Sequence, residues 1–278
     1  MTTPSQAEKG RAFRALHERD QAFIIPNPWD VGSARMLASL GFEALASTSA
    51  GYAFSVGLLD NHVGRDAMLR HVSELAAATD LPVSADLENA FGDSPEVVAD
   101  TFTRAAATGL VGGSIEDSTG RANEPIYEFS FAVERVKAAV ATIRALPFTF
   151  TLTARAENFL NGRADLDDTI ERLQAYERAG ADVLFAPALP TLDAVRTVCS
   201  SVTRPVNFMV GIPGKSFSVA ELAAAGVRRV SLATSLYRAA MTGLIEAARE
   251  VRESGTFAYL DSMVTSAEFA GYLKKPAA

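Results

Sequence analysis

Three acidic residues follow two predicted strands at the points where those strands end. Asp86 and Glu88 come after the run 81–85, and Glu116 comes after the run 111–115. Carboxylates two positions apart on an emerging strand point the same way, and a third from the next strand can join them around one hard cation. Because Mg²⁺ and Mn²⁺ take oxygen ligands, we expect Asp86, Glu88 and Glu116 to bind one such ion.

An arginine ends another predicted strand. Arg155 closes the run 151–155, and its planar guanidinium suits a two-point contact with a substrate carboxylate. The alternative is a structural ion pair with Glu157 or another acid, which is compatible with a catalytic role. Acidic residues near strand ends can also simply cap a helix or pair with an arginine, and we expect no more than that of Asp117.

Weaker signals surround these residues. Asp60 lies in the long connection after the second predicted strand, where it could accept a hydrogen bond from metal-bound water, although alone it is an ordinary loop aspartate. The stretch 47–52 offers backbone N–H groups suited to a carboxylate or enolate oxygen, with a plain turn as the alternative. Asn207, in the seventh predicted strand, is expected to line the same site.

The composition excludes several classes of protein. The chain has 278 residues, a formal net charge of −7 with scattered basic residues, and one cysteine, Cys199. These features argue against a nucleic-acid or membrane-surface partner, an intrachain disulfide and a cysteine-based zinc site. There is no run of about 18 apolar residues and no signal-peptide pattern at the start. We therefore expect a cytoplasmic protein.

The elements that position these residues alternate regularly. Short apolar or β-branched runs recur, each followed by a turn and a helix-period segment, and this rhythm predicts a (β/α)8 TIM-type barrel, with a doubly wound open sheet as the weaker alternative. The eight expected strands are 22–25, 44–47, 83–86, 113–116, 149–154, 183–186, 206–210 and 230–233. The expected helices between them include 65–78, 94–108, 129–144, 166–179 and 219–225.

The C-terminal region exceeds what a barrel needs. After the eighth strand, 235–253 has the pattern of a long helix, and 257–273 has that of a further amphipathic segment. Its apolar face either packs back on its own barrel or crosses to a partner subunit, and the sequence alone leaves both open.

The motifs together resemble one known family, the isocitrate lyase and phosphoenolpyruvate mutase superfamily, with carboxyvinyl-carboxyphosphonate phosphorylmutase-like or oxaloacetate decarboxylase-like members as the expected subgroup. The resemblance covers nearly the whole chain. It is carried by Pro26-Asn-Pro-Trp-Asp30, Ser47-Thr-Ser-Ala-Gly51, Ser84-Ala-Asp-Leu-Glu-Asn-Ala-Phe-Gly-Asp93, Ser114-Ile-Glu-Asp117 and Leu152-Thr-Ala-Arg-Ala-Glu-Asn-Phe-Leu-Asn-Gly162.

The resemblance implies a role for each candidate. The family's metal-site acids fall on Asp86, Glu88 and Glu116, and Asp86 also faces the substrate. Its outer aspartate falls on Asp60, its substrate arginine on Arg155, and its oxyanion-holding backbone on Thr48, Ser49 and Ala50. The implied fold is one barrel domain, 1–278, with a helical extension from about 256 to 278. The resemblance further implies that the last helix is exchanged between subunits of a homodimer or homotetramer.

One loop departs from the family pattern. Lyases of this family resemble one another in a loop after the Glu-Asp pair that carries lysine, cysteine and histidine. Here 118–128 reads Ser-Thr-Gly-Arg-Ala-Asn-Glu-Pro-Ile-Tyr-Glu, without any of these. Only Asn123 and Arg121 could be counterparts of the loop in phosphonate-processing members. The loop 118–128 therefore matches neither the lyase version nor the phosphonate-processing version in full.

The expected activity follows from what family members share. They act on a Mg²⁺-bound 2-oxo acid and leave a pyruvate enolate. We expect a Mg²⁺-dependent lyase or decarboxylase of a small 2-oxo dicarboxylate such as oxaloacetate, because decarboxylation needs no cysteine acid for the leaving group. The alternatives are phosphonopyruvate-type carbon–phosphorus chemistry, methylisocitrate-type cleavage, and a catalytically silent barrel that binds 2-oxo acids.

Overall fold

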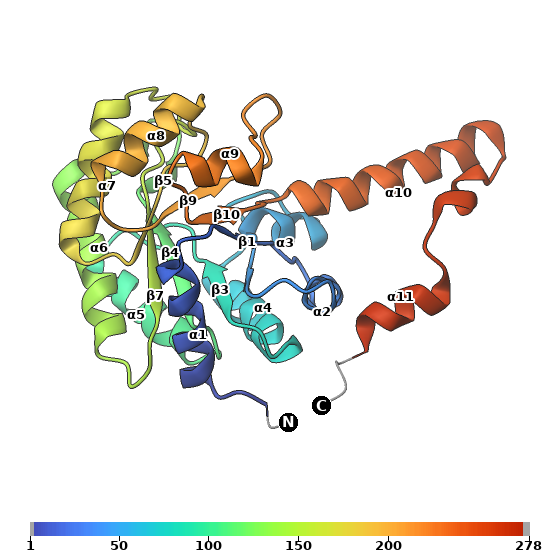
Figure 1. Cartoon of the computed structure of the whole chain (residues 1–278), viewed down its shortest axis with the longest axis horizontal. Coiled ribbons are helices and arrows are strands. Elements are labelled where there is room, and N and C mark those ends of the chain that lie inside the picture. Colours follow the sequence, from blue (N-terminus) through green and yellow to red (C-terminus); the bar gives the residue numbers. More distant parts are fainter. Residues whose placement is uncertain (1–2, 275–278) are drawn as a thin grey trace.

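Eight parallel strands form the centre of the molecule. The computed structural model describes residues 3–274, and its main sheet has the order β1-β10-β9-β8-β7-β4-β3-β2 (Figure 1). The Ala46 amide donates to the Pro26 carbonyl at 3.0 Å, so the two outer strands approach each other and the barrel is nearly closed. The strands are β1 (Phe23–Ile25), β2 (Leu45–Ala46), β3 (Val83–Asp86), β4 (Gly112–Glu116), β7 (Thr151–Arg155), β8 (Val183–Phe185), β9 (Val206–Met209) and β10 (Arg229–Ser231).

The predicted barrel is confirmed, and the open sheet is excluded by this strand order. Every expected strand is present, with ends that differ from the predicted ones by two residues at most. Strands such as Val183–Phe185 are buried along their whole length, as expected of parallel strands that are covered on both faces.

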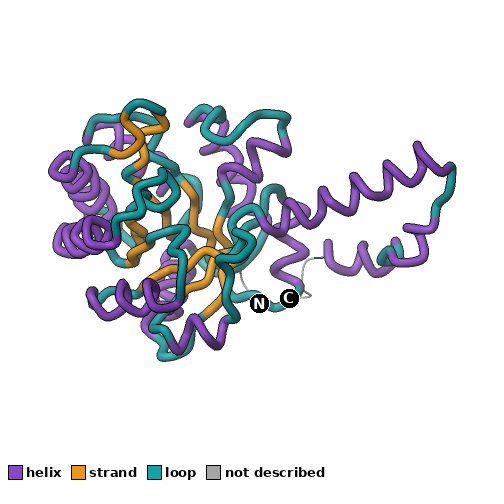
Figure 2. The backbone as a smooth tube through the Cα atoms, turned by 90° about the horizontal axis from the view of Figure 1, so that it is seen from above, coloured by secondary structure: helices purple, strands orange, loops and turns teal. Residues whose placement is uncertain are grey.

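Helices surround the barrel (Figure 2). They begin at side-chain caps: Ser94 caps one helix ahead of Pro95, and Asp165 caps another, satisfying amide groups at the first turn. Gly180 ends a helix at φ 105°, a left-handed conformation that favours glycine. The helices are α1 (Gln6–Glu18), α2 (Val31–Ser39), α3 (Ser49–Ser55), α4 (Arg65–Ala78), α5 (Pro95–Ala106), α6 (Phe129–Arg144), α7 (Leu166–Ala179), α8 (Leu192–Ser201) and α9 (Val219–Ala224).

Two apolar clusters make up the core. The larger lies between the strands and the surrounding helices, where the rings of Phe102 and Phe150 meet edge to face at 6.2 Å. The smaller joins Phe13 and Leu16 of α1 to residues at the starts of strands, including Phe23. The N-terminal ends of the strands are therefore covered, and the carboxyl ends are left for a site.

The loop 118–128 contains a hairpin that the sequence analysis did not predict. Its antiparallel strands are β5 (Ser118–Arg121) and β6 (Glu124–Ile126). The alternating apolar signal that usually identifies strands is missing from this segment.

The C-terminal region leaves the barrel as an arm (Figure 1). Helix α10 (Ser235–Ser254) projects outward, and the chain returns through the 3₁₀ helix η1 (Ala258–Ser262) to α11 (Ser266–Leu273), which contacts α2. The segment 257–273 consists of these two helical pieces, which are separated at Met263, where the backbone is extended. Residues 275–278 of the predicted extension lie outside the described residues. No helix within 3–274 is long and apolar enough to cross a membrane.

Candidate active site

A cavity of about 510 Å³ opens at the carboxyl ends of the strands. This is the end of a barrel where catalytic residues are found in enzymes of this architecture. Every residue proposed from the sequence for the site lines this one cavity: Thr48, Ser49, Ala50, Asp60, Asp86, Glu88, Glu116, Arg155 and Asn207.

Arg155 is the centre of the charged cluster in the cavity. Its guanidinium contacts Asp86 at 2.9 Å, Glu116 at 3.2 Å and Glu157 at 2.7 Å. Burial alone would lower the pKa of Arg155, yet these three carboxylates hold its pKa well above the usual range. The structural ion pair with Glu157 is thus present, and the fork expected to face a substrate is occupied by acids of the chain itself.

Glu88 reaches the cavity by a different route from the one predicted. Strand β3 ends at Asp86, and Glu88 adopts φ 51°, so strand alternation does not orient it. Its Oε1 atom is buried without a hydrogen-bond partner. Burial, followed by the neighbouring Asp86 and Asp60 carboxylates, raises the pKa of Glu88 to about 8. The Arg155 cation opposes this rise but does not outweigh burial and the two neighbouring carboxylates.

The residues of the cavity fit a divalent cation. Five acidic side chains line it, namely Asp60, Asp86, Glu88, Glu116 and Glu157. The guanidinium of Arg155 lies between them and pairs with three. Within 3–274, no three histidine, cysteine or acidic side chains are already arranged as a metal site, since Asp86 and Glu116 point to Arg155 instead. The excess of negative charge and the unpartnered Glu88 oxygen are nevertheless what an oxygen-ligated cation would satisfy.

The second strand's loop forms a helix rather than a plain turn. Thr48 caps α3, and its hydroxyl accepts from the Gly51 amide. The Ser49 hydroxyl donates to Asp86 at 2.7 Å, and the Ser47 hydroxyl accepts from the Asp86 amide at 2.9 Å. The loop therefore holds the Asp86 carboxylate in place.

Asp60 and Asn207 lie at opposite depths of the cavity. Asp60 is exposed, although partial desolvation and the nearby Asp86 carboxylate raise its pKa. Asn207 is buried, and its amide donates to the Ser231 hydroxyl at 3.0 Å and accepts from Arg229 at 2.8 Å.

Arg229 and Asn27 are among the cavity-lining residues that the sequence analysis did not propose. Arg229 is buried in β10, and Asn27 follows β1 and donates to the Ser47 carbonyl at 3.0 Å. Asn27 could have been noticed, because it lies within the motif Pro26-Asn-Pro-Trp-Asp30. The signal for Arg229 was the pair Arg228-Arg229 directly before the apolar run of the last predicted strand. Asp117, in contrast, has the structural role expected of it, pairing with Arg172 at 3.1 Å.

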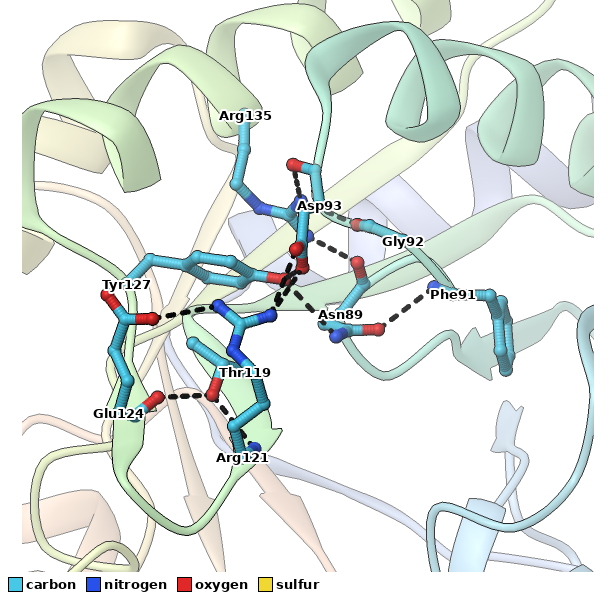
Figure 3. A network of polar contacts seen from close by, with 9 residues as sticks. All are labelled: Asn89, Phe91, Gly92, Asp93, Thr119, Arg121, Glu124, Tyr127 and Arg135. Atoms are coloured by element: carbon cyan, nitrogen blue, oxygen red, sulfur yellow. Dashed lines mark hydrogen bonds and ion pairs between the residues drawn. The ribbon is translucent and has the colours of Figure 1, made fainter.

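A polar network fixes the segment that carries Glu88 (Figure 3). Arg135 is fully buried and donates to the backbone carbonyls of Asn89, Gly92 and Asp93. Its guanidinium lies over the Tyr127 ring, 4.2 Å from the centroid. These contacts constrain a segment in which Ala90 and Phe91 also have positive φ.

The same network anchors the β5–β6 hairpin. Arg121 pairs with Asp93 at 2.9 Å and with Glu124 at 3.2 Å, and the Tyr127 hydroxyl donates to Asp93 at 2.5 Å. Of 118–128, only Ser118 lines the cavity. Arg121 and Asn123, the two residues weighed as counterparts of the phosphonate-processing loop, do not.

Comparison with known proteins gives a consistent result. The profile of the phosphoenolpyruvate phosphomutase family matches residues 13–252. A crystal structure of a provisionally named lyase/mutase from Burkholderia cenocepacia J2315 is 56% identical, with a TM-score of 0.95 over 98% of this chain and 97% of that one.

Two similar proteins are named for an enzymatic activity. The 2-methylisocitrate lyase of Escherichia coli (strain K12) is 29% identical and aligns over 93% of this chain and 90% of its own length. The oxaloacetate decarboxylase of Chromohalobacter salexigens is 27% identical, over 91% of this chain and 88% of its own length.

Proposed function

Because the chain belongs to the phosphoenolpyruvate phosphomutase family, we propose that it is a Mg²⁺- or Mn²⁺-dependent carbon–carbon lyase that decarboxylates a small 2-oxo dicarboxylate such as oxaloacetate. The observation that carries this proposal is the acidic cluster around Arg155, with the unpartnered Glu88 beside it, at the carboxyl ends of the strands. The relationship to an oxaloacetate decarboxylase supports the choice of substrate.

The proposed cation ligands are Asp86, Glu88 and Glu116, with Asp60 as an outer acceptor. When bound, a divalent ion polarises the carbonyl and carboxylate oxygens of a 2-oxo acid and stabilises the negative charge that develops when a carbon–carbon bond breaks. Cation binding would draw Asp86 and Glu116 away from Arg155 and free its fork for a substrate carboxylate.

The chain's own residues orient and stabilise the substrate. Arg155 holds an acidic group of the 2-oxo acid, and backbone N–H groups of Thr48, Ser49 and Ala50 face the oxygen that gains charge. Preorganised donors of this kind favour the transition state over the ground state. The bonding electrons of the departing carboxylate remain as the enolate of pyruvate, and carbon dioxide leaves without a proton donor.

The β5–β6 hairpin supports decarboxylation over the alternatives. Cleavage of methylisocitrate requires a positioned acid or base, and loss of such a group typically costs about 10²–10⁴ in rate. None of the residues 118–128 is a lysine, cysteine or histidine. Carbon–phosphorus chemistry is disfavoured because Arg121 is paired with acidic residues away from the cavity.

Turnover of a substrate panel tests the proposal. Oxaloacetate, phosphonopyruvate, methylisocitrate and 2-oxoglutarate are assayed with Mg²⁺ and with a chelator, and Mg²⁺ without protein corrects for spontaneous decarboxylation. We expect oxaloacetate to be preferred and methylisocitrate to be cleaved at least about a thousandfold less efficiently. Preference for phosphonopyruvate, or robust succinate release from methylisocitrate, would contradict the proposal. An absence of turnover would favour a silent binding barrel.

We further propose that the protein is a cytoplasmic homodimer or homotetramer in which the C-terminal helix packs on a neighbouring subunit. The support comes from α10 and α11, which contain no buried residue. Large apolar side chains are exposed along the arm, among them Leu244, Phe257, Leu260 and Phe269. Light scattering coupled to size exclusion measures the mass, and a monomer at micromolar concentration would exclude helix exchange.

A further inference from the structure

Arg229 is a buried cation at the cavity that the proposed chemistry does not use. It is the first residue of β10, it lines the same cavity as the acidic cluster, and it is only 6% exposed. Its strand partners in register are Asn207 of β9 and Phe23 of β1. Arg229 therefore lies near the start of its strand, deeper in the barrel than the charged residues at the strand ends.

The partners of Arg229 are neutral. Its Nε donates to the Asn207 side-chain oxygen at 2.8 Å, and its Nη1 lies 3.4 Å from His17 Nε2. His17 Nδ1 lies 2.8 Å from the Phe13 carbonyl, so Nδ1 carries the proton and Nε2 is left as an acceptor. Among residues 3–274, no carboxylate forms an ion pair with Arg229.

A buried guanidinium without an acid is unfavourable for folding. Removing a charge from water is costly unless an opposite charge or enough hydrogen bonds replace the solvent. Burial, followed by the nearby Arg155 cation, lowers the pKa of Arg229 to about 9.

We propose that Arg229, oriented by Asn207, binds the second acidic group of the substrate, a carboxylate or a phosphonate. This inference rests on the proposed function, in which the 2-oxo acid end of the substrate lies at the acidic cluster. One cavity reaches both positions, and its volume of about 510 Å³ lies within the roughly 300–1,000 Å³ typical of small-molecule sites. The molecule would thus select 2-oxo acids that carry a second anion.

Direct binding measurements test the proposal without relying on turnover. Calorimetry compares pyruvate, which has one acidic group, with 2-oxoglutarate and phosphonopyruvate, which have two, each in the presence of Mg²⁺. The wild-type protein should bind at least one of the diacids more tightly than pyruvate. Arg229→Met should lower the affinity for that diacid by roughly 10- to 100-fold, as expected for loss of a hydrogen bond to a charged group. The same variant should change the affinity for pyruvate less than threefold.

The two diacids distinguish the chemistry of the second group. A loss confined to 2-oxoglutarate identifies a carboxylate, and a loss confined to phosphonopyruvate identifies a phosphonate. Arg70→Met is the control, because Arg70 is exposed on α4 and is not among the residues that line the cavity. It should leave all three affinities within threefold. Equal effects of Arg229→Met on pyruvate and diacids, or no effect on any of them, would overturn the proposal.

Stability separates ligand binding from a structural role. Replacing an unpaired buried charge by an apolar side chain of similar size is often neutral or stabilising. The thermal midpoint of ligand-free Arg229→Met should therefore equal or exceed that of the wild type. If this variant does not fold, Arg229→Lys keeps the charge without the fork and should still lose selectivity for the diacid. Retained selectivity in Arg229→Lys together with misfolding of Arg229→Met would show a structural residue. Failure of the turnover panel leaves these binding results unaffected.

Discussion

Arg155 and Arg229 line one cavity and share none of their polar contacts. Arg155 is surrounded by Asp86, Glu116 and Glu157, whereas the polar contacts of Arg229 are with Asn207 and His17. Arg155 is half-buried and Arg229 is buried, and this difference alone says little about their roles. Their contacts differ more clearly. The charge of Arg155 is balanced by the carboxylates of the acidic cluster, whereas the hydrogen-bond partners of Arg229 are neutral and leave its charge without a matching carboxylate.

The largest expected effect concerns the acids on the Arg155 side. Asp86→Ala should abolish metal-dependent binding of oxalate, because Asp86 is both a proposed ligand and a contact of Arg155. Calorimetry with Mg²⁺ and oxalate measures the binding, and thermal unfolding checks that the protein is folded. Glu124→Ala, on the exposed hairpin, is the control that should bind as wild type. If the Asp86→Ala variant still bound oxalate in a metal-dependent way, the assignment of the metal site to the acids around Arg155 would be wrong.

The second prediction concerns Arg155 itself. Arg155→Lys keeps the charge but loses the planar fork, so kcat/KM on the best substrate of the panel should fall by roughly 10²–10³, as it does when one oxyanion donor is removed. A loss mainly in kcat would indicate a contact that strengthens in the transition state. Near wild-type kinetics would make Arg155 a purely structural ion-pair residue, and the proposed placement of the substrate would be wrong.

A smaller effect is expected from the support beneath Glu88. Arg135→Met removes the donor to three backbone carbonyls of the segment after Glu88. Loss of such indirect support of a metal ligand typically lowers metal affinity by about 10- to 100-fold. The measurement is Mg²⁺ titration in the presence of oxalate. Arg121→Met, which removes an exposed pair with Asp93, should change the affinity less than twofold. Equal effects of the two variants would show that the network does not act through Glu88.

The smallest expected effect is on stability and concerns His17, the neutral partner of Arg229. Burial, aided by the Arg229 cation, lowers the pKa of His17 to about 3. The unfolded chain binds a proton at His17 below about pH 6.5 and the folded chain does not, so stability should fall as the pH drops from about 6.5 toward 3, by up to about 1.4 kcal/mol per pH unit. Chemical denaturation at pH 7 and pH 5.5 measures the difference. His17→Leu should remove this part of the pH dependence; an unchanged slope would show that His17 is protonated in the fold.

The sequence predicted most of the barrel because its strands and helices are locally encoded. The runs that precede Asp86 and Glu116 and the cap at Gly180 carry their signals within a few residues. The β5–β6 hairpin was missed because ion pairs with distant residues such as Asp93 hold it, rather than an apolar pattern.

The site could be predicted as a list of residues but not as a set of contacts. Strand ends bring Asp86, Glu116 and Arg155 to one cavity, and the sequence shows which strands end there. That Arg155 pairs with three acids at once depends on side-chain geometry across three strands. Arg229 was missed because Arg228 and Arg229 are adjacent in sequence, and only the strand register determines which of them faces inward.

Because the C-terminal arm is exposed, the helix content of the protein should depend on its concentration. Helix α10 has 20 residues and none is buried, so in an isolated chain it lacks most of the tertiary packing from which helices in proteins gain their stability. Whatever covers the arm binds only the helical form and stabilises it by mass action. Dilution should therefore unwind α10 while the barrel stays folded, and far-ultraviolet circular dichroism would record a partial loss of helix that reverses on concentration.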